Sequence, residues 1–444
     1  MSDKKTFYKF VIPSMIAFAL SGVYAIVDGY FVGNAIGDAG LSAINIAYPI
    51  VALQQAIGTG IGMGGAVYYS IYKAEGRLKK AESFIAVGWW LLVAASFILT
   101  IAIFFSARRL LVLLGAESMI LSYAEEYIKV IALGTLLQIL GTGLVPFMRN
   151  YGGAFWAMAA MASGFITNII LDYLFVWVFE WGTEGAAGAT IIGQGITMTI
   201  AIIYALLKNS FFLRTNPKEV GEVCRSVCRI GLAPFALTLT PNISLMLINR
   251  FSASYGGEKA IATYACISYI ICIIYLILQG VGDGSQPLMS RCYGEKDTMK
   301  LKYFRKKAYF LAIFLAATGG ILMFAFRAEV GVLFGTSDEV NAEVAAVIPI
   351  FLIALPFVAV NRITAAGFYA TEKSVLSYAT AMAEPCFMLV FMLILPRFFG
   401  GQIMVWWSTV LSQISAAALA VIFALKTHRE ENVSGDSGSL SMFL

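Results

Sequence analysis

The stretch GIGMGGAVYYS (residues 60–70) returns later in the chain as GVGDGSQPLMS (280–290). When the two stretches are aligned residue by residue, three glycines and the last serine coincide. The same offset, which we call the repeat offset, places LLGAES (113–118) on LFGTSD (333–338). Because a constant offset between separated segments is typical of an internal duplication, the sequence predicts two structurally similar halves.

The composition indicates that both halves lie in a membrane. The chain has 444 residues, of which 59% are hydrophobic and 13% charged, and its mean hydropathy is +0.80. That charged fraction is about half of what a soluble globular protein carries. A transmembrane helix needs about 20 apolar residues. Twelve apolar runs are long enough, near residues 8–33, 41–72, 84–106, 123–147, 155–179, 186–207, 230–253, 261–289, 308–327, 344–370, 374–396 and 403–425.

The predicted fold is therefore an all-α integral membrane protein with twelve transmembrane helices in two six-helix lobes. Six spans are an even number, so both lobes enter the membrane in the same sense, and a parallel pseudo-two-fold axis along the membrane normal relates them. We expect an N-lobe over 1–207, a basic amphipathic cytoplasmic linker over 208–229, a C-lobe over 230–425 and a polar cytoplasmic tail over 426–444.

The distribution of positive charge predicts the orientation. If the chain crosses the membrane twelve times, the two termini and every second loop lie on one side. That side carries 23 Lys and Arg residues, and the loops on the other side carry 7. Cytoplasmic loops are the ones enriched in Lys and Arg. The sequence thus predicts that both termini are cytoplasmic and that the first span is retained.

Four acidic residues fall well inside predicted spans, where a carboxylate costs about 2.5–3.5 kcal/mol and needs a partner, a water-filled cavity or a cation. Asp28 follows Tyr24 by one turn in the first span, and Asp172 follows Asn168 by one turn in the fifth. Such a pair can simply join two helices by hydrogen bonds, but we favour ion coupling, because intramembrane acids are usually functional. Pro13 leaves a carbonyl of the first span without its helical donor and permits a bend.

The second half carries its own intramembrane charges, Asp283, Arg362 and Glu384. An arginine in a span is about as costly as an acid, so these residues can neutralise one another as a pair or triad, or they can contact the substrate. The sequence leaves both interpretations open for this C-lobe polar cluster. Uncharged candidates for a cavity or for interhelical hydrogen bonds are Gln54, Gln55, Asn242 and Gln279.

At these residues the chain resembles the MATE (multidrug and toxic compound extrusion) transporter family over nearly its full length. The run NIILDYLF (168–175) is similar to the family's Asn-x3-Asp-Tyr-x-Phe run, GAAGAT (185–190) follows it, and the first span carries P-x14-D-G-Y-F-V-G. The resemblance implies an N-lobe site for a proton or Na+, with Tyr24 and the bending Pro13 nearby. Its residues would be Asp28, Asn168, Asp172 and Thr190.

The sequence also departs from part of that family. Members related to the Na+-coupled NorM branch carry an acid in the seventh span and another in the tenth. The corresponding runs here, PNISLMLINR (241–250) and AVNRITAAG (359–367), contain no carboxylate. The repeat also places Asn168 and Asp172 on methionines 388 and 392. We therefore expect asymmetric coupling chemistry.

The predicted function is secondary active antiport by alternating access in a bacterial or archaeal cytoplasmic membrane. Amphipathic, mostly cationic drugs or metabolites would leave in exchange for H+ or Na+. A buried carboxyl group can take up a proton, and two carboxylates with Asn and Thr oxygens can also hold a hard cation, so the coupling ion stays open. We expect a monomer whose partners are the bilayer and a small-molecule substrate.

Two other classes of protein are alternatives. A lipid-linked precursor flippase of the same superfamily usually has more spans and a strongly basic central cavity. An intramembrane enzyme needs a catalytic constellation, whereas the single histidine, His428, lies in the tail. We expect no cofactor and no nucleic-acid partner, because the glycine-rich runs lack the G-K-[ST] of a phosphate loop and the excess positive charge is small and scattered.

Overall fold

The computed structural model describes residues 2–208, 213–333 and 336–440, with the backbone alone at Asp38 and over 428–440. All of its regular secondary structure in these ranges is helical. Part of the predicted linker (209–212), the side chain of His428 and the last residues of the predicted tail (441–444) lie outside the described residues.

The helices follow one another in two similar series. Long apolar runs form helices because lipid offers no hydrogen-bond partner to an unpaired backbone. The first series is α1 (Asp3–Ile36), α2 (Asp38–Ala74), α3 (Leu78–Leu113), α4 (Ser118–Leu133), α5 (Thr135–Asn150), α6 (Ala154–Asp172), the π-helix η1 (Tyr173–Val178) and α7 (Gly182–Leu207). The second is α8 (Val220–Tyr255), α9 (Gly257–Gly294), α10 (Thr298–Ala325), α11 (Arg327–Leu333), α12 (Asp338–Leu352), α13 (Leu355–Ala370), α14 (Ser374–Phe399) and α15 (Gln402–Leu440).

Within the described ranges, ten helices are long and apolar enough to cross a membrane alone, and two bent pairs supply two further spans. The pair α4–α5 bends by 61° and the pair α12–α13 by 46°. The breaks fall at Gly134 and at Ile353–Ala354, so the repeat offset that relates the two glycine-rich stretches also relates the two bends. The prediction of twelve helical spans in two six-span halves is confirmed.

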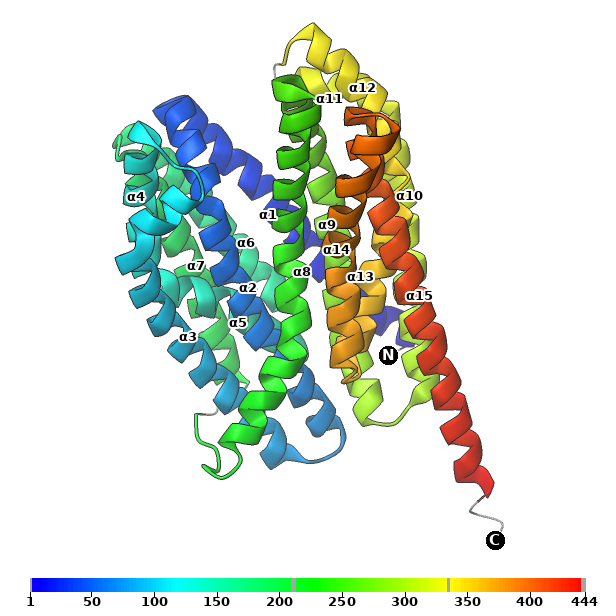
Figure 1. Ribbon diagram of the computed structural model, residues 1–444. Helices are drawn as coiled ribbons and strands as arrows, with labels where there is room; N and C mark the ends of the chain where they lie inside the picture. The colour runs from blue at the N-terminus through cyan, green and yellow to red at the C-terminus, as the bar shows by residue number, and fades with distance from the viewer. Residues whose placement is uncertain (1, 209–212, 334–335, 441–444) are drawn as a thin grey trace.

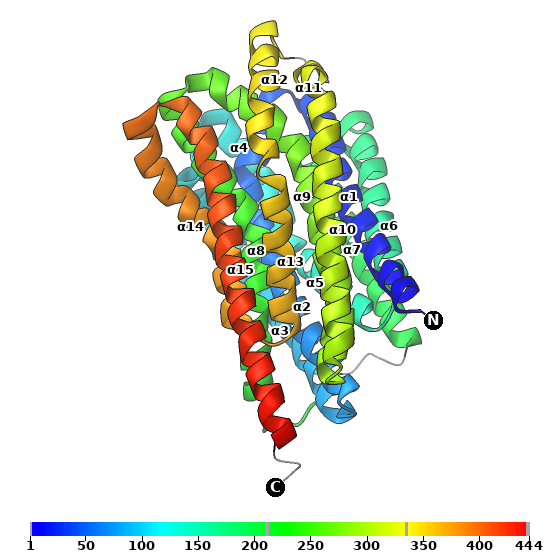
Figure 2. The same ribbon diagram turned by 90° about the vertical axis from the view of Figure 1, so that its right-hand side faces the viewer.

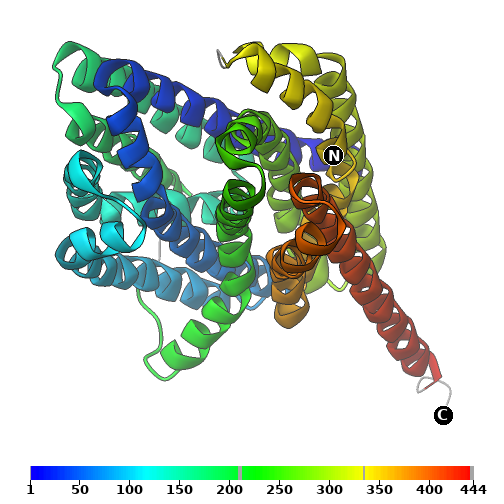
Figure 3. The same cartoon turned by 45° about the horizontal axis from the view of Figure 1, so that its top comes forward.

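The two lobes converge at one end of the molecule and diverge toward the other (Figure 1). We call the converging end, where α7 leads through the linker into α8, the linker end, and the opposite end, which carries α11 and α12, the far end. The view from the side and the tilted view show α1 starting beside the C-lobe helices and crossing into the N-lobe (Figures 2 and 3).

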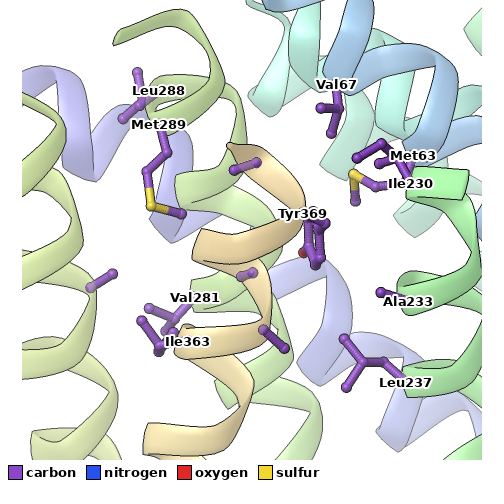
Figure 4. Packing of buried hydrophobic residues seen from close by; sticks show 14 of the residues in the cluster. Met63, Val67, Ile230, Ala233, Leu237, Val281, Leu288, Met289, Ile363 and Tyr369 are labelled. Carbon is purple, nitrogen blue, oxygen red and sulfur yellow. The ribbon is translucent and has the colours of Figure 1, made fainter. Parts of the chain in front are cut away.

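The hydrophobic packing follows the same division. One large buried cluster joins both lobes, and it contains Met63 and Val67 of α2, Ile230 of α8 and Tyr369 of α13 (Figure 4). Toward the far end, a second cluster has members from the N-lobe alone and a third from the C-lobe alone. The apolar core thus holds the lobes together only on the linker side.

Glycines allow the lobes to approach at that shared cluster. A Cβ added at Gly60 would meet the Gly231 carbonyl at 2.8 Å, and one added at Gly64 would overlap the Val227 carbonyl. In the second lobe, Gly284 meets α1 in the same manner, at Val11. α2 therefore crosses α8, and α9 crosses α1, with backbone against backbone, as small residues permit in membrane proteins.

Gly231→Ala should destabilise the protein by separating α8 from α2, because its added methyl group overlaps the Gly60 carbonyl. We expect a loss on the order of 1–3 kcal/mol, typical of overpacking, and a lower midpoint of thermal unfolding in detergent. Gly221→Ala, on the same helix but with open space around its Cβ, is the matched control and should leave the midpoint unchanged. Equal midpoints for the two variants would show that this crossing is not tight.

Candidate functional site

The predicted N-lobe residues come together from three helices. Asp28 lies on α1, Asn168 and Asp172 on the last two turns of α6, and Thr190 on α7. Asp172, Asn168 and Thr190 are buried and Asp28 is half-buried. The Asn168 amide donates to the Thr190 hydroxyl at 3.5 Å, and the carboxyl groups of Asp28 and Asp172 are electrostatic neighbours.

Four oxygen atoms of this site lack hydrogen-bond donors. Both carboxylate oxygens of Asp172, Oδ1 of Asp28 and Oδ1 of Asn168 are buried without a hydrogen-bond partner. An unpartnered carboxylate in low dielectric is costly, and two adjacent carboxylates repel each other. Carboxylate, amide and hydroxyl oxygens of this kind are the ligand types that hard cations prefer.

Local structure explains how α6 presents these oxygens. The run NIILDYLF changes from α-helix to π-helix immediately after Asp172. π-helical turns are rare and frequently occur at functional sites. On the facing helix α1, the Tyr24 ring stacks on Phe165 with centroids 5.1 Å apart, which positions α1 against α6 one turn before Asp28.

Two tyrosines complete the surroundings. Tyr24 of α1 and Tyr127 of α4 are electrostatic neighbours of both carboxyl groups. Tyr24 was expected from the sequence. Tyr127 was not, because it follows Glu125 and Glu126 in a span whose apolar run gave no reason to single out one tyrosine.

Pro13 lies away from this group. It is 15 residues before Asp28 on the continuous helix α1, a separation of about 22 Å at 1.5 Å per residue. Its neighbour Ser14 instead contacts Gly280 and Gly284 of α9 at the lobe crossing. The structure therefore associates Pro13 with the packing between the lobes rather than with the carboxyl pair.

The structure does not join the C-lobe charges into a pair or triad. Asp283 forms its ion pair with Arg149 of α5, at 3.3 Å. Arg362 donates to the Leu237 carbonyl at 3.1 Å and to Oε1 of Gln279 at 3.3 Å, and Gln279 in turn donates to Asp283 at 2.8 Å. Asp283 is satisfied from across the lobe boundary, which is why Arg362 and Asp283 need no direct contact.

Glu384 occupies a separate position in the C-lobe. Its carboxylate accepts from Ser244 of α8 at 3.0 Å, and Tyr264 and Tyr275 are its electrostatic neighbours. Asn242 lies two residues before Ser244 and is half-buried. Glu384 and Asn242 are thus separate from the Arg149–Asp283–Gln279–Arg362 chain of contacts.

Arg149 is a charged residue of this region that the sequence did not single out. It follows an apolar run and precedes NYGG, so it reads as a loop residue on the positively charged side. The structure places it in the last turn of α5 with 3% of its surface exposed. Its position in the repeat was an available signal, because the repeat offset places it on Tyr369, which lies in a span.

Two similar lobes of six spans each, with buried acidic side chains between the spans, are the arrangement expected of a membrane transporter. The MatE family model matches this chain twice, over residues 13–174 and 234–394. The chain therefore belongs to the MatE family, which confirms the predicted resemblance. The starts and the ends of the two matches are separated by nearly the repeat offset, in agreement with the internal duplication. Membership of a transporter family also agrees with the expectation that the chain is not an enzyme.

Curated relatives and solved structures agree with this assignment. The "Multidrug export protein MepA" of Staphylococcus saprophyticus is 24% identical over 424 residues, which cover 94% of this chain and 93% of that protein. A structure described as the outward-facing conformation of a multidrug resistance MATE family transporter matches with a TM-score of 0.88 at 21% identity. A MOP superfamily transporter from Pyrococcus furiosus, described as having a binding pocket of reverse polarity, matches with a TM-score of 0.89 at 20% identity. Each of the two matches covers 96% of this chain and 96% of the chain in the solved structure.

Tyr127→Phe should reduce ion-driven transport while leaving the protein folded, because it removes a hydroxyl beside the carboxyl pair and Thr190. Loss of one polar group near the carboxyl pair should cost about 1 kcal/mol, so we expect an initial rate about fivefold lower in proteoliposomes. The control Tyr123→Phe lies one turn earlier on α4 and should transport at the wild-type rate. If both variants transport equally well, Tyr127 does not belong to the site.

Proposed function

We propose that this transporter exports amphipathic cations in exchange for H+ or Na+ bound between Asp28 and Asp172. The observation that carries the proposal is the set of buried, unpartnered oxygens on Asp28, Asn168 and Asp172. A positive charge arriving there would remove a large electrostatic cost. A site of this kind binds and releases an ion readily only if water reaches it in part of the cycle, and the half-buried Asp28 is the member closest to such access.

The energy available from one ion is sufficient for useful export. One elementary charge moving through 100 mV releases about 2.3 kcal/mol. That corresponds to a substrate gradient of about fifty-fold. A single coupled ion therefore suffices, and a site with two carboxylates can bind one proton or one Na+.

The lobes supply the alternating access. The shared apolar cluster closes the linker end, while each lobe has its own cluster toward the far end. With the linker end in the cytoplasm, this arrangement corresponds to an outward-facing state. Reversing the tilt of the lobes would close the far end and expose the same central surfaces to the cytoplasm, as in other transporters with parallel repeats.

Cationic substrates suit the C-lobe as well as the N-lobe. Glu384 is 4% exposed and is an electrostatic neighbour of Tyr264 and Tyr275. A carboxylate beside aromatic rings attracts organic cations through charge and through the ring faces. The bacterial relative described as a multidrug export protein supports the same class of substrate.

The coupling proposal is tested by measuring the uptake of ethidium into everted vesicles, which corresponds to export from the cell, under an imposed pH or Na+ gradient. Asp28→Asn and Asp172→Asn should each lower gradient-stimulated transport at least about tenfold, because a neutral amide neither releases a proton nor attracts Na+ strongly. The gradient that drives the wild type identifies the ion. Asp338→Asn, an exposed acid at the start of α12, is the matched control and should transport normally. Full gradient-driven transport by both N-lobe variants would refute the proposal.

The proposed orientation places the linker end, the N-terminus and α15's end in the cytoplasm, in keeping with its excess of Lys and Arg. Cys228 is exposed on the linker-end extension of α8. In a variant that retains only Cys228, a membrane-impermeant maleimide should label everted vesicles and leave intact cells unlabelled. Labelling of intact cells alone would show the reverse orientation.

A further inference from the structure

The buried ion pair between Arg149 and Asp283 crosses from one lobe to the other. Arg149 lies in the last turn of α5 of the N-lobe, and Asp283 lies in the glycine-rich stretch of α9 in the C-lobe. Nη1 and Oδ2 are 3.3 Å apart, and each side chain is only 4% exposed. Among the ion pairs of the described residues, it alone has both side chains this deeply buried.

Each partner is held within its own lobe by other contacts. Asp283 Oδ1 accepts from Tyr369 at 2.8 Å and from Gln279 at 2.8 Å, both C-lobe residues, so only Oδ2 depends on Arg149. The Arg149 guanidinium lies over the Phe18 ring of α1 at 5.2 Å. Separation of the lobes would therefore break one contact, Arg149 to Oδ2, and would leave both side chains in place.

A hydrogen-bonded layer lies next to the ion pair. The Asn150 amide donates to Gln286 Oε1 of α9 at 2.9 Å, and Ser70 of α2 donates to Asn150 Oδ1 at 2.6 Å. In the C-lobe, Gln286 donates to Ser290 at 2.8 Å. Polar groups in adjacent turns of α5 and α9 thus meet face to face beside the apolar cluster that joins the lobes.

We propose that Arg149 and Asp283, supported by Asn150 and Gln286, form an interlobe lock that closes the linker end and must open once in each transport cycle. This buried ion pair favours the arrangement of the lobes in which the two side chains meet. Each charge keeps contacts within its own lobe, but the two opposite charges meet only while the lobes are together, and water must replace that contact when the lobes part. The lock needs the two-lobe rocking motion but is independent of the coupling ion and of the substrate.

The lock can be tested by measuring a distance between the lobes. Exposed residues Lys79 of α3 and Lys302 of α10 lie at the linker end of different lobes and accept spin labels after substitution by cysteine in a background without the native cysteines. We expect one main distance in lipid nanodiscs without substrate or gradient. Arg149→Gln and Asp283→Asn should each raise the population of longer distances on the order of tenfold, a usual size for coupling between two states.

The double variant Arg149→Gln with Asp283→Asn distinguishes a lock from two unrelated effects. Removing both charges leaves no unpaired charge, so its longer-distance population should not exceed that of either single variant. Arg149→Lys keeps the charge and should retain the closed distance. The matched control Arg291→Gln removes an exposed pair within α9, to Glu295 at 2.8 Å, and should leave the distance unchanged.

Two results would overturn the proposal. Unchanged distances in both single variants would show that the pair does not hold the lobes together, and additive effects in the double variant would show that the residues act independently. The midpoint of thermal unfolding, measured for each variant, shows whether that variant is folded. If Arg149→Gln is unfolded, Asp283→Asn and Arg149→Lys still carry the test. Because no gradient or substrate is used, a failure of the coupling proposal would not affect this experiment.

Discussion

A charge inside the membrane must find compensation, and that constraint determines the polar structure of this transporter. Asp283 and Asp172 show the two ways of meeting it. The Asp283 carboxylate has an ion-pair partner and two hydrogen-bond donors within the protein. Both oxygens of Asp172 have no donor, and its neighbour is another acid. The first arrangement suits a contact that holds two lobes in one position, and the second suits a site whose missing charge comes from solution.

The duplication explains why these two tasks lie in different lobes. The repeat offset places Asp172 on Met392 and Asp283 on Met63. Met392 is buried in the C-lobe cluster, and Met63 in the cluster that joins the lobes. Each lobe therefore carries an acid where the other carries an apolar side chain. The two halves pack in the same way, so their helices, bends and glycine crossings repeat. Each charged site, in contrast, occurs in one half only.

The features of the fold that could be predicted from the sequence are those that depend on periodic or repeated patterns. Length and hydropathy specified twelve spans, and the repeat specified two lobes, because each signal extends over tens of residues. The N-lobe group was also predictable, since Asn168 and Asp172 share one helix face and lie in a specific motif. Contacts between helices that are far apart in the sequence could not be predicted. Arg149 lies at the end of an apolar run, and only the approach of α9 turns that apparent loop position into a buried one.

Helix α1 connects the two charged sites mechanically. It carries Asp28 beside Asp172, and four turns earlier its Val11 and Ser14 pack against Gly284, the residue next to Asp283. A helix that is continuous from Asp3 to Ile36 transmits a displacement along its length, except where a hydrogen bond is missing. Pro13 removes such a bond beside the crossing with α9. The gap that Pro13 leaves in the hydrogen bonding of α1 therefore lies at the lobe interface, beside the glycines that let the lobes approach.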